Sequence, residues 1–342
     1  MFNIVTAQGG QTSVRSSRAE QVMTSAILNV TSEKQTKVSV LSGYNQSDIS
    51  PFTTLLEMNN FEIIHENLVT IEDIDSNANI VLLVAPSRDI SENDLRKLDR
   101  FLINNNEFGN TLFYITGAHE APMSQFPNLS AWLREWGIEV YDSVLIEMEP
   151  AYRFSLQDPF IAFVDYSDNE IAQELSLSFR NRELLVASFY SRPLSVLFEE
   201  RGFHNVNPLL QTTEFSGIAP EDGDLTNWNI TGPHPVLVLS TTTHYQGATM
   251  LTSHVLVCGF LSSFNPYVLG EVNFANSEYF LELMNTLVNR EDTVRIQDKT
   301  FSISSIQVTL AQVRILSFIF VILLPFGMIA SGIVVWLRRR HR

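Results

Sequence analysis

An adjacent base and acid, His119 and Glu120, form the pair of side chains best suited to chemistry in this chain. They follow an apolar run, and such a pair can relay protons to a bound molecule. A second histidine, His244 in the segment STTTHYQG, lies among hydroxyl groups and could bind a polar ligand. The alternative is that all three are ordinary loop residues, because no two histidines have the H-x-x-x-H or H-E-x-x-H spacing of a metal site.

Ser87 is the hydroxyl closest to the position of a catalytic nucleophile, because the turn Ala85-Pro86-Ser87-Arg88 follows an apolar run. A nucleophile elbow requires small residues on both sides of the nucleophile. Pro86 and Arg88 do not meet this requirement, so we interpret Ser87 as a loop hydroxyl. The one cysteine, Cys258 in VLVCGF, cannot form an internal disulfide or a cysteine-rich metal site, and we expect it to be a small buried hydrophobe.

Motifs for cofactors and ions are absent from the sequence. It contains neither G-x-G-x-x-G nor G-x-x-x-x-G-K-[ST], so no backbone cradle for a nucleotide is predicted. The acidic segment VDYSDNE, residues 164–170, lacks EF-hand spacing and is typical of a capped helix start. We therefore expect no catalytic residue, no cofactor and no bound metal.

The elements that would carry these residues alternate between strand and helix. Continuous apolar runs such as NIVLLVA, residues 79–85, are typical of parallel strands covered on both faces. Ser50 with Pro51, and Ser91 with Asp94, mark helix starts, and Gly137 marks a helix end. The predicted strands are 37–42, 61–65, 79–85, 111–116 and 138–146, and the predicted helices are 50–58, 91–102 and 129–136.

This alternation predicts the α/β class, with a doubly wound, mainly parallel sheet of the Rossmann or flavodoxin type. The pattern is weaker between residues 150 and 235. Further strands are predicted at 161–164, 185–190, 236–240 and 254–260, and Ser277 is predicted to cap a last helix. We expect one α/β domain over residues 37–295.

Doubly wound sheets bind their ligands beyond the carboxyl ends of the strands. The loops predicted at that edge are 43–48, 86–89, 117–120 and 262–266. The residues expected to contact a ligand or partner there are Gly43, Tyr44, Asn45, Pro86, Ser87, His119, Glu120 and His244.

The end of the chain has the composition of a membrane anchor. Residues 315–337 form a run of 23 residues without an ionisable side chain, and four arginines lie among residues 338–342. As a helix this run would be roughly 35 Å long, enough to span a bilayer. Arginines beside a span favour the cytoplasm, so we expect the body of the chain outside the cytoplasm and in contact with membrane lipid. Inside the span, a proline and small residues predict a face for packing against another helix, formed by Pro325, Gly327, Ser331 and Gly332.

The body of the chain is acidic. All 38 Asp and Glu residues precede residue 314, and five of the 22 Lys and Arg residues lie from residue 314 onward. Such a body disfavours nucleic acid as a partner. Residues 1–36 contain neither a signal peptide nor a span, so we expect a targeting segment ahead of Met1. The alternative is a cytoplasmic body, which would move the arginines through the membrane. Residues 296–314 are expected to link the domain to the span.

Several segments together resemble one transporter family. VLLVAPSRD, DLRKLDRFL, PNLSAWLREWGIEV, FANSEYFLELMNTLVNRED and the closing pattern LP…G…WLRRR are similar to the auxiliary subunits of gliding-motility (Gld-type) ABC transporters. The resemblance runs from residue 37 to residue 342 and is weakest between 150 and 235. It implies a non-catalytic extracytoplasmic subunit in the bacterial cell membrane, beside an ABC permease and its ATPase, with an amidotransferase-like domain that has lost its catalytic residues. The alternative is an anchored sugar- or peptide-binding protein that works without a permease.

The charge pattern predicts that Arg342 is cytoplasmic and that Asn45 is external. In a Cys258→Ser background, a cysteine that replaces Asn45 should react with a membrane-impermeant maleimide on intact cells. A cysteine that replaces Arg342 should react only after the membrane is permeabilised. The reverse labelling pattern would overturn this topology.

Overall fold

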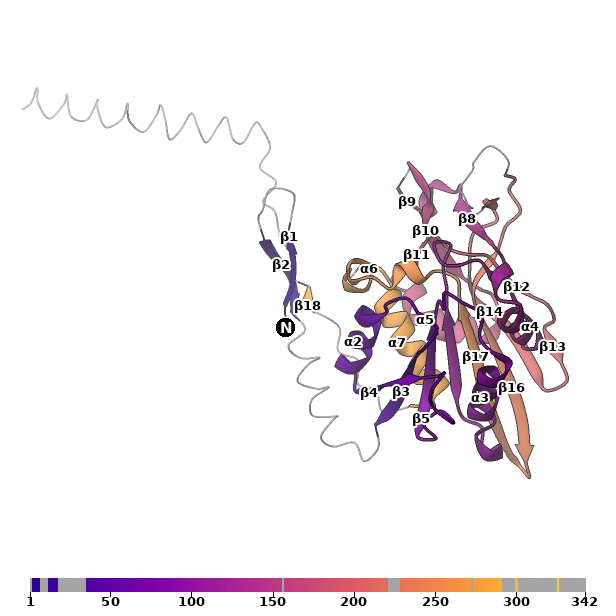
Figure 1. The fold of residues 1–342 in the computed structure, drawn as a ribbon. Coiled ribbons are helices and arrows are strands. Elements are labelled where there is room, and N and C mark those ends of the chain that lie inside the picture. Colours follow the sequence, from indigo (N-terminus) through magenta and orange to yellow (C-terminus); the bar gives the residue numbers. More distant parts are fainter. Residues whose placement is uncertain are drawn as a thin grey trace, which may run out of the picture. The chain divides into compact units, whose positions relative to one another are not determined.

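The computed structural model describes residues 2–6, 12–17, 35–155, 157–220, 228–271, 273–290, 299–300 and 325. The chain forms a larger unit over Arg18–Asp298 and a smaller one from Phe2–Ser17 and Lys299–Arg342 (Figure 1). In the smaller unit, β1 (Phe2–Thr6) and β2 (Thr12–Ser17) form an antiparallel hairpin, and β18 (Lys299–Thr300) pairs with β2. The sequence patterns do not predict this small sheet.

One 11-stranded sheet organises the larger unit, in the order β11-β10-β14-β16-β17-β6-β5-β3-β4, with β13 and β9 attached to it. The strands from β17 to β4 are parallel neighbours, and the other pairs are antiparallel. The parallel half consists of β17 (Thr249–Cys258), β6 (Thr111–Ile115), β5 (Ala78–Val84), β3 (Thr36–Ser42) and β4 (Phe61–Asn67). The antiparallel half consists of β11 (Val186–Phe189), β10 (Asp158–Tyr166), β14 (His204–Gln211), β16 (Pro235–Gln246), β9 (Arg153–Ser155) and β13 (Glu200–Arg201).

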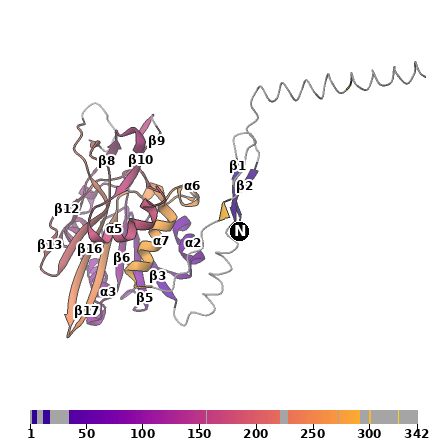
Figure 2. The same ribbon diagram turned by 180° about the vertical axis from the view of Figure 1, so that it is seen from behind.

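Helices cover both faces of this sheet, because its central strands have no polar face. Every residue of β6 is buried, and the side chains from Ile80 to Val84 in β5 are at most 1 % exposed. One face carries α2 (Ser50–Met58), α5 (Glu170–Arg180), α6 (Pro266–Gly270) and α7 (Asn276–Leu287). The other face carries α3 (Glu92–Ile103) and α4 (Pro127–Glu135), as Figure 1 shows, whereas Figure 2 shows α5 and α7 on the first face. The α/β class predicted from the continuous apolar runs is confirmed.

The antiparallel half departs from the predicted doubly wound arrangement. β16 and β17 form a long hairpin around Gly247, whose φ is +64°, and β17 then pairs in parallel with β6. Pairing direction depends on how strands are connected, and an apolar run has the same pattern in either direction. The sequence therefore predicted β10, β11, β16 and β17 without their directions, and it did not predict β9, β13 or β14.

The predicted strand 138–146 is two strands, which is a correction. β7 (Ile138–Val140) pairs with β12 (Leu194–Val196), and β8 (Ser143–Glu147) pairs with β15 (Ser216–Pro220). The break lies at Asp142, whose carboxylate accepts hydrogen bonds from the backbone N–H groups of Met123 and Ser124. The strand divides here because its two halves pair with different strands.

The helix starts are partly as predicted. Ser91 is the N-cap of α3 and accepts from the Asp94 N–H, as the capping-box spacing predicts. Ser50 is the first residue of α2 and not its cap, because Ile49 occupies the N-cap position without a side-chain bond. Asp48 instead accepts from the Ser50 N–H and hydroxyl, and these bonds lower the pKa of the Asp48 carboxyl.

The predicted membrane span 315–337 and the tail 338–342 lie outside the described residues, apart from Pro325. Gly327, Ser331 and Gly332 are therefore not placed. Within the described part of the chain, no helix is long and apolar enough to cross a membrane.

Side chains close the outer edge of the sheet at β11. Asn276 accepts from the Ala187 N–H at 2.8 Å and donates to the Ala187 carbonyl at 2.9 Å. Ser263 accepts from the Phe189 N–H at 2.8 Å. Asn276 is fully buried and is the first residue of α7, so Ser277 is not the cap that the sequence predicts. The side-chain amide of Asn276 bonds to the backbone of β11, where a further strand would otherwise pair.

Replacing Asn276 by alanine should lower the free energy of unfolding by about 2–4 kcal/mol, because one buried N–H and one buried carbonyl lose their partners. Asn273→Ala is the matched control. Asn273 is exposed, and among the described residues its bonds go to Glu271, so its loss should change stability by less than about 0.5 kcal/mol. Equal effects in urea unfolding would contradict a closing role for Asn276.

Candidate functional site

The loops predicted to form a crevice lie together at the carboxyl edge of the parallel strands. The loop after β5 bonds to the loop after β3: the Ser87 N–H donates to the Tyr44 carbonyl at 2.9 Å, and Arg88 donates to the Gly43 carbonyl at 2.6 Å. The loop after β6 joins them, because Ser47 donates to Oε2 of Glu120 at 2.7 Å. These short bonds link three segments that are distant in sequence.

Gly43 has a backbone role at this edge. Its φ is +107°, and a Cβ there would lie 2.4 Å from Oδ1 of Asn67 and 2.9 Å from Cγ2 of Val69. No other residue has both the required conformation and the room. Pro86 and Tyr44 are buried, so the predicted contact residues that remain exposed on these loops are Asn45, Ser87 and His119.

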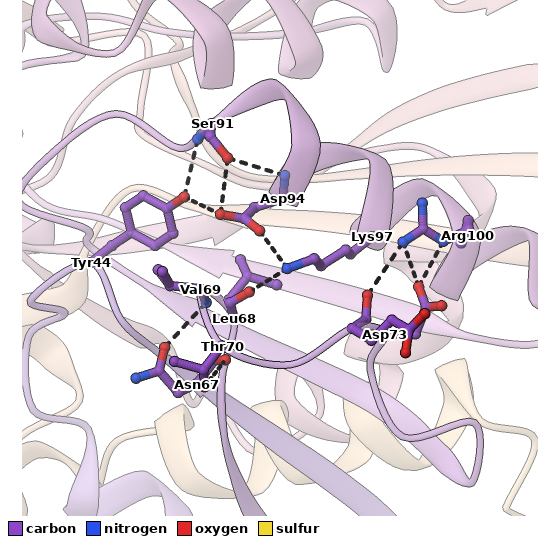
Figure 3. A network of polar contacts seen from close by, with 11 residues as sticks. Tyr44, Asn67, Leu68, Val69, Thr70, Asp73, Ser91, Asp94, Lys97 and Arg100 are labelled. Atoms are coloured by element: carbon purple, nitrogen blue, oxygen red, sulfur yellow. Dashed lines mark hydrogen bonds and ion pairs between the residues drawn. The ribbon is translucent and has the colours of Figure 1, made fainter.

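A buried ion pair fixes the loop after β3 to α3 (Figure 3). Nζ of Lys97 lies 2.6 Å from Oδ1 of Asp94 and donates to the Leu68 carbonyl at 2.7 Å. The other carboxylate oxygen accepts from the Tyr44 hydroxyl and, at 2.9 Å, from the Ser91 hydroxyl. Asp94 and Lys97 are each only 5 % exposed. The ion pair itself lies within α3, and its hydrogen bonds to Tyr44 and Leu68 join this helix to the loops after β3 and β4.

Burial and bonding act on Asp94 in opposite directions. Desolvation raises the pKa of its carboxyl, but hydrogen bonds from Lys97, Tyr44 and Ser91 and the charge of Lys97 outweigh that effect. The pKa of Asp94 is therefore below its ordinary value, and the carboxylate stays ionised. A buried carboxylate bonded in this way holds neighbouring segments together and stays ionised at neutral pH.

His119 and Glu120 are directed to different partners. The His119 ring packs against Tyr190 with 4.5 Å between centroids, and the Glu120 carboxylate accepts from Ser47. The two residues lie in a turn, in which the Glu120 N–H donates to the Gly117 carbonyl at 3.1 Å, and their side chains leave this turn toward different neighbours. This geometry favours the alternative of separate loop residues over a proton relay.

Arg192 is a further structural residue that the sequence did not indicate. Its side chain is fully buried, and it donates to the Glu120 carbonyl at 2.8 Å and the Ala121 carbonyl at 3.1 Å. Its own backbone N–H donates to the Gly259 carbonyl at 2.8 Å. Arg192 thus holds the His119 loop against the segment after β17. A lone arginine in the weakly patterned region 150–235 carries no sequence signal of such burial.

Ala85 occupies a strained position immediately after β5. Its φ is +32°, a region that residues with a Cβ rarely adopt, and its N–H donates to the Ile115 carbonyl at 2.8 Å. In a nucleophile elbow, such a turn presents the reactive side chain. Here the residue is alanine, and the Ser87 hydroxyl two residues later donates to the Tyr44 carbonyl at 3.3 Å.

His244 does not belong to this edge, which corrects the predicted set of loop residues. It lies on β16, close to the hairpin turn, where β17 begins and not where it ends. Its ring is stacked between Phe108 and Phe203, with centroid distances of 4.4 and 5.0 Å. The sequence placed STTTHYQG in a loop because its hydroxyl residues are as common in turns as in strands.

Burial shifts the pKa of two further side chains, Cys258 and His254. Cys258 is fully buried, as predicted, and desolvation raises the pKa of its thiol far above the ordinary value. Burial lowers the pKa of His254 to about 4, so this residue is neutral at physiological pH. Among the residues that the structure describes, no group of three or more His, Cys, Asp or Glu side chains could hold a metal ion.

Comparison with known proteins identifies a fold and no family. No family description and no curated protein matches the chain. The solved N-terminal domain of mmIFT52 covers 76 % of this chain and 100 % of its own length, with a TM-score of 0.51 and 15 % identity. A glutamine amidotransferase from Thermotoga maritima covers 75 % of this chain and 99 % of its own, with a TM-score of 0.38 and 9 % identity. PurLQS from the same organism covers 74 % and 100 %, with a TM-score of 0.34 and 12 % identity. The first shares the fold, and the other two superpose too loosely to add to it.

Because the Asp94–Lys97 pair is buried, we expect Lys97 to contribute far more to stability than Arg96, the neighbouring cation of α3. Lys97→Met should lower the free energy of unfolding by about 3–5 kcal/mol, because it leaves a buried carboxylate without its counter-charge. Adding Asp94→Leu should recover part of that loss. Arg96→Met is the control: Arg96 is exposed and 3.9 Å from Glu92, and exposed pairs contribute less than about 1 kcal/mol.

The same pair gives a pH dependence. Because folding lowers the pKa of Asp94, its carboxylate contributes stability above the unfolded pKa of about 4. That contribution is lost as the pH falls through the folded pKa. Denaturant unfolding between pH about 6 and about 3 should therefore show a larger loss in the wild type than in Asp94→Asn. Parallel curves would mean that Asp94 is not ionised in the folded protein.

Proposed function

We propose that this chain is a non-catalytic, membrane-anchored auxiliary subunit of an ABC transport system, with its α/β domain outside the cytoplasm. The observation that carries the proposal is Ala85. It has the strained backbone that a nucleophile would require at the end of a buried parallel strand, and it has no reactive group. This supports a sheet domain of the doubly wound, amidotransferase-like kind in which the catalytic position has been lost.

A rigid binding surface is the role that the loops at this edge support. Their backbones are fixed by Tyr44, Arg88 and the Asp94–Lys97 pair, while Asn45, Ser87 and His119 remain exposed. A surface that is ordered before binding loses little conformational entropy when a partner docks. The Gld-type resemblance names the partner class, an ABC permease and its ATPase.

A specific observation also favours the alternative of a sugar- or peptide-binding protein. Rings of His119, Tyr190 and Phe160 follow one another at the same edge, with centroid distances of 4.5 and 6.0 Å. Tyr190 has a φ of +50°, and its hydroxyl donates to Asp158 at 2.9 Å. Strained aromatic residues beside a carboxylate occur at ligand sites.

Affinity purification of the full-length chain from its own membranes in mild detergent tests the proposal. A permease and an ATPase should co-purify, and Gly327→Leu or Ser331→Leu in the predicted span should release the permease while the chain stays in the membrane. Ile329→Leu, on another face of the span, is the control and should retain it. Membrane retention without any transporter subunit, together with binding of a soluble sugar or peptide that His119→Ala and Tyr190→Ala abolish, would favour the alternative.

A further inference from the structure

Two histidines on neighbouring strands face the same side of the sheet at the base of the β16–β17 hairpin. In the antiparallel pairing of β14 with β16, His204 lies opposite Thr242. His244 follows Thr242 by two residues in the same regular ladder, so its side chain leaves the strand on the same side. Diagonal neighbours of this kind have Cα atoms about 7–8 Å apart, a distance that two imidazole side chains can bridge.

Aromatic side chains fix the orientation of both imidazole rings. His244 is stacked between Phe108 and Phe203, with centroid distances of 4.4 and 5.0 Å. The His204 ring meets the Trp136 ring nearly at a right angle, with 4.8 Å between the centroids. Both histidines are half-buried, so each keeps an accessible side. Two rings that are held in place before binding lose little conformational entropy when they bind a common ligand.

One nitrogen of His204 has no hydrogen-bond partner. Its Nδ1 atom is buried, and among the residues that the structure describes no group bonds to it. A buried polar atom without a partner destabilises the folded state, and native structures contain few of them. The Nδ1 lone pair is therefore available to an ion that binds at this position.

The surroundings of His204 keep its ring neutral. Desolvation, and after it the neighbouring His244, lower the pKa of His204 below its ordinary value. Arg201, which lies opposite His204 on β13, directs its guanidinium to the Phe198 ring at 5.5 Å. None of the ion pairs between described residues involves either histidine. A neutral imidazole without a carboxylate partner is the form of histidine that binds metal ions.

We propose that His204 and His244 together bind one divalent transition-metal ion of the kind that prefers imidazole, such as Zn²⁺, Ni²⁺ or Cu²⁺. Water completes its coordination, since the described residues offer no group of three or more metal-binding side chains. Ca²⁺ and Mg²⁺ require several oxygen ligands, which two imidazoles do not supply. The sequence predicted no metal because the two histidines are far apart in it and form no spacing motif.

The bound ion ties the hairpin to the strand beside it. The pairing of β14 with β16 stops at Thr242, and beyond this point the described partner of β16 is β17. A metal bridge between His204 and His244 extends the connection of β14 with β16 by one further position on that face. Because such an ion binds the folded chain in preference to the unfolded one, it raises the stability of the fold as its concentration rises.

Metal titration of the full-length chain, first stripped with a chelator, tests this inference. Zn²⁺ should raise the Tm of the wild type, and Mg²⁺ should not. His204→Gln and His244→Phe should each weaken Zn²⁺ binding at least about 10-fold and remove the rise in Tm. His244→Phe keeps an aromatic ring between Phe108 and Phe203, so its fold without metal should be intact. His65→Gln is the control, because His65 is exposed on β4, away from this pair, and its loss should leave Zn²⁺ binding unchanged.

A second measurement needs no variant. Electron paramagnetic resonance of the wild type loaded with one equivalent of Cu²⁺ should show two coordinated imidazole nitrogens. One imidazole or none would overturn the inference, as would a wild type whose Tm does not respond to Zn²⁺. A rise in Tm that persists in His244→Phe would place the ion elsewhere and also overturn it. None of these outcomes depends on the proposed transporter partner.

Discussion

The ion pair between Lys97 and Asp94 sets the constraint on which the carboxyl edge of the sheet depends. Two charges that are each 5 % exposed must be fully bonded, since an unpaired buried charge costs several kcal/mol. Their partners are the Tyr44 hydroxyl and the Leu68 carbonyl, so the loops that carry these groups have one allowed position. The loops then approach so closely that only glycine fits at position 43. A rigid edge follows from a local electrostatic requirement.

Much of the parallel half could be predicted because its signals are local. NIVLLVA is buried on both sides, Ser91 and Asp94 form the expected cap, and Gly137 ends α4 with a φ of +78°. Lys97 could not be identified, because a lysine three residues after an aspartate on a helix usually forms a solvated pair. Its burial depends on the loop that brings the Leu68 carbonyl to it. The local pattern therefore predicts an exposed Lys97, whereas the contact with the Leu68 loop buries it.

The sequence predicted which loops lie together at the carboxyl edge of the strands, but it did not predict which side chains they bring together. The loops of Tyr44, Ser87 and Glu120 meet where strand order requires. His244 was misplaced, because only the length of the β16–β17 hairpin shows that it lies at the other end of the strands. Ala85 was passed over in favour of Ser87, since a strained φ leaves no trace in the identity of the residue. Closure of the β11 edge by Asn276 was equally invisible, because an asparagine at a helix start is normally its cap.

The seam between β6 and β17 has a consequence for how the protein is made. Residues 111–115 pair with residues 254–258, so the inner parallel strands wait for a partner that is synthesised much later. Until then one edge of β6, a strand whose five residues are all buried in the folded protein, has no partner, and such an edge is the kind of surface that misassembles between nascent chains. Such long-range parallel pairing is intrinsically slow to form. A truncation before residue 254 would therefore leave this edge of β6 without the strand that covers it in the folded protein.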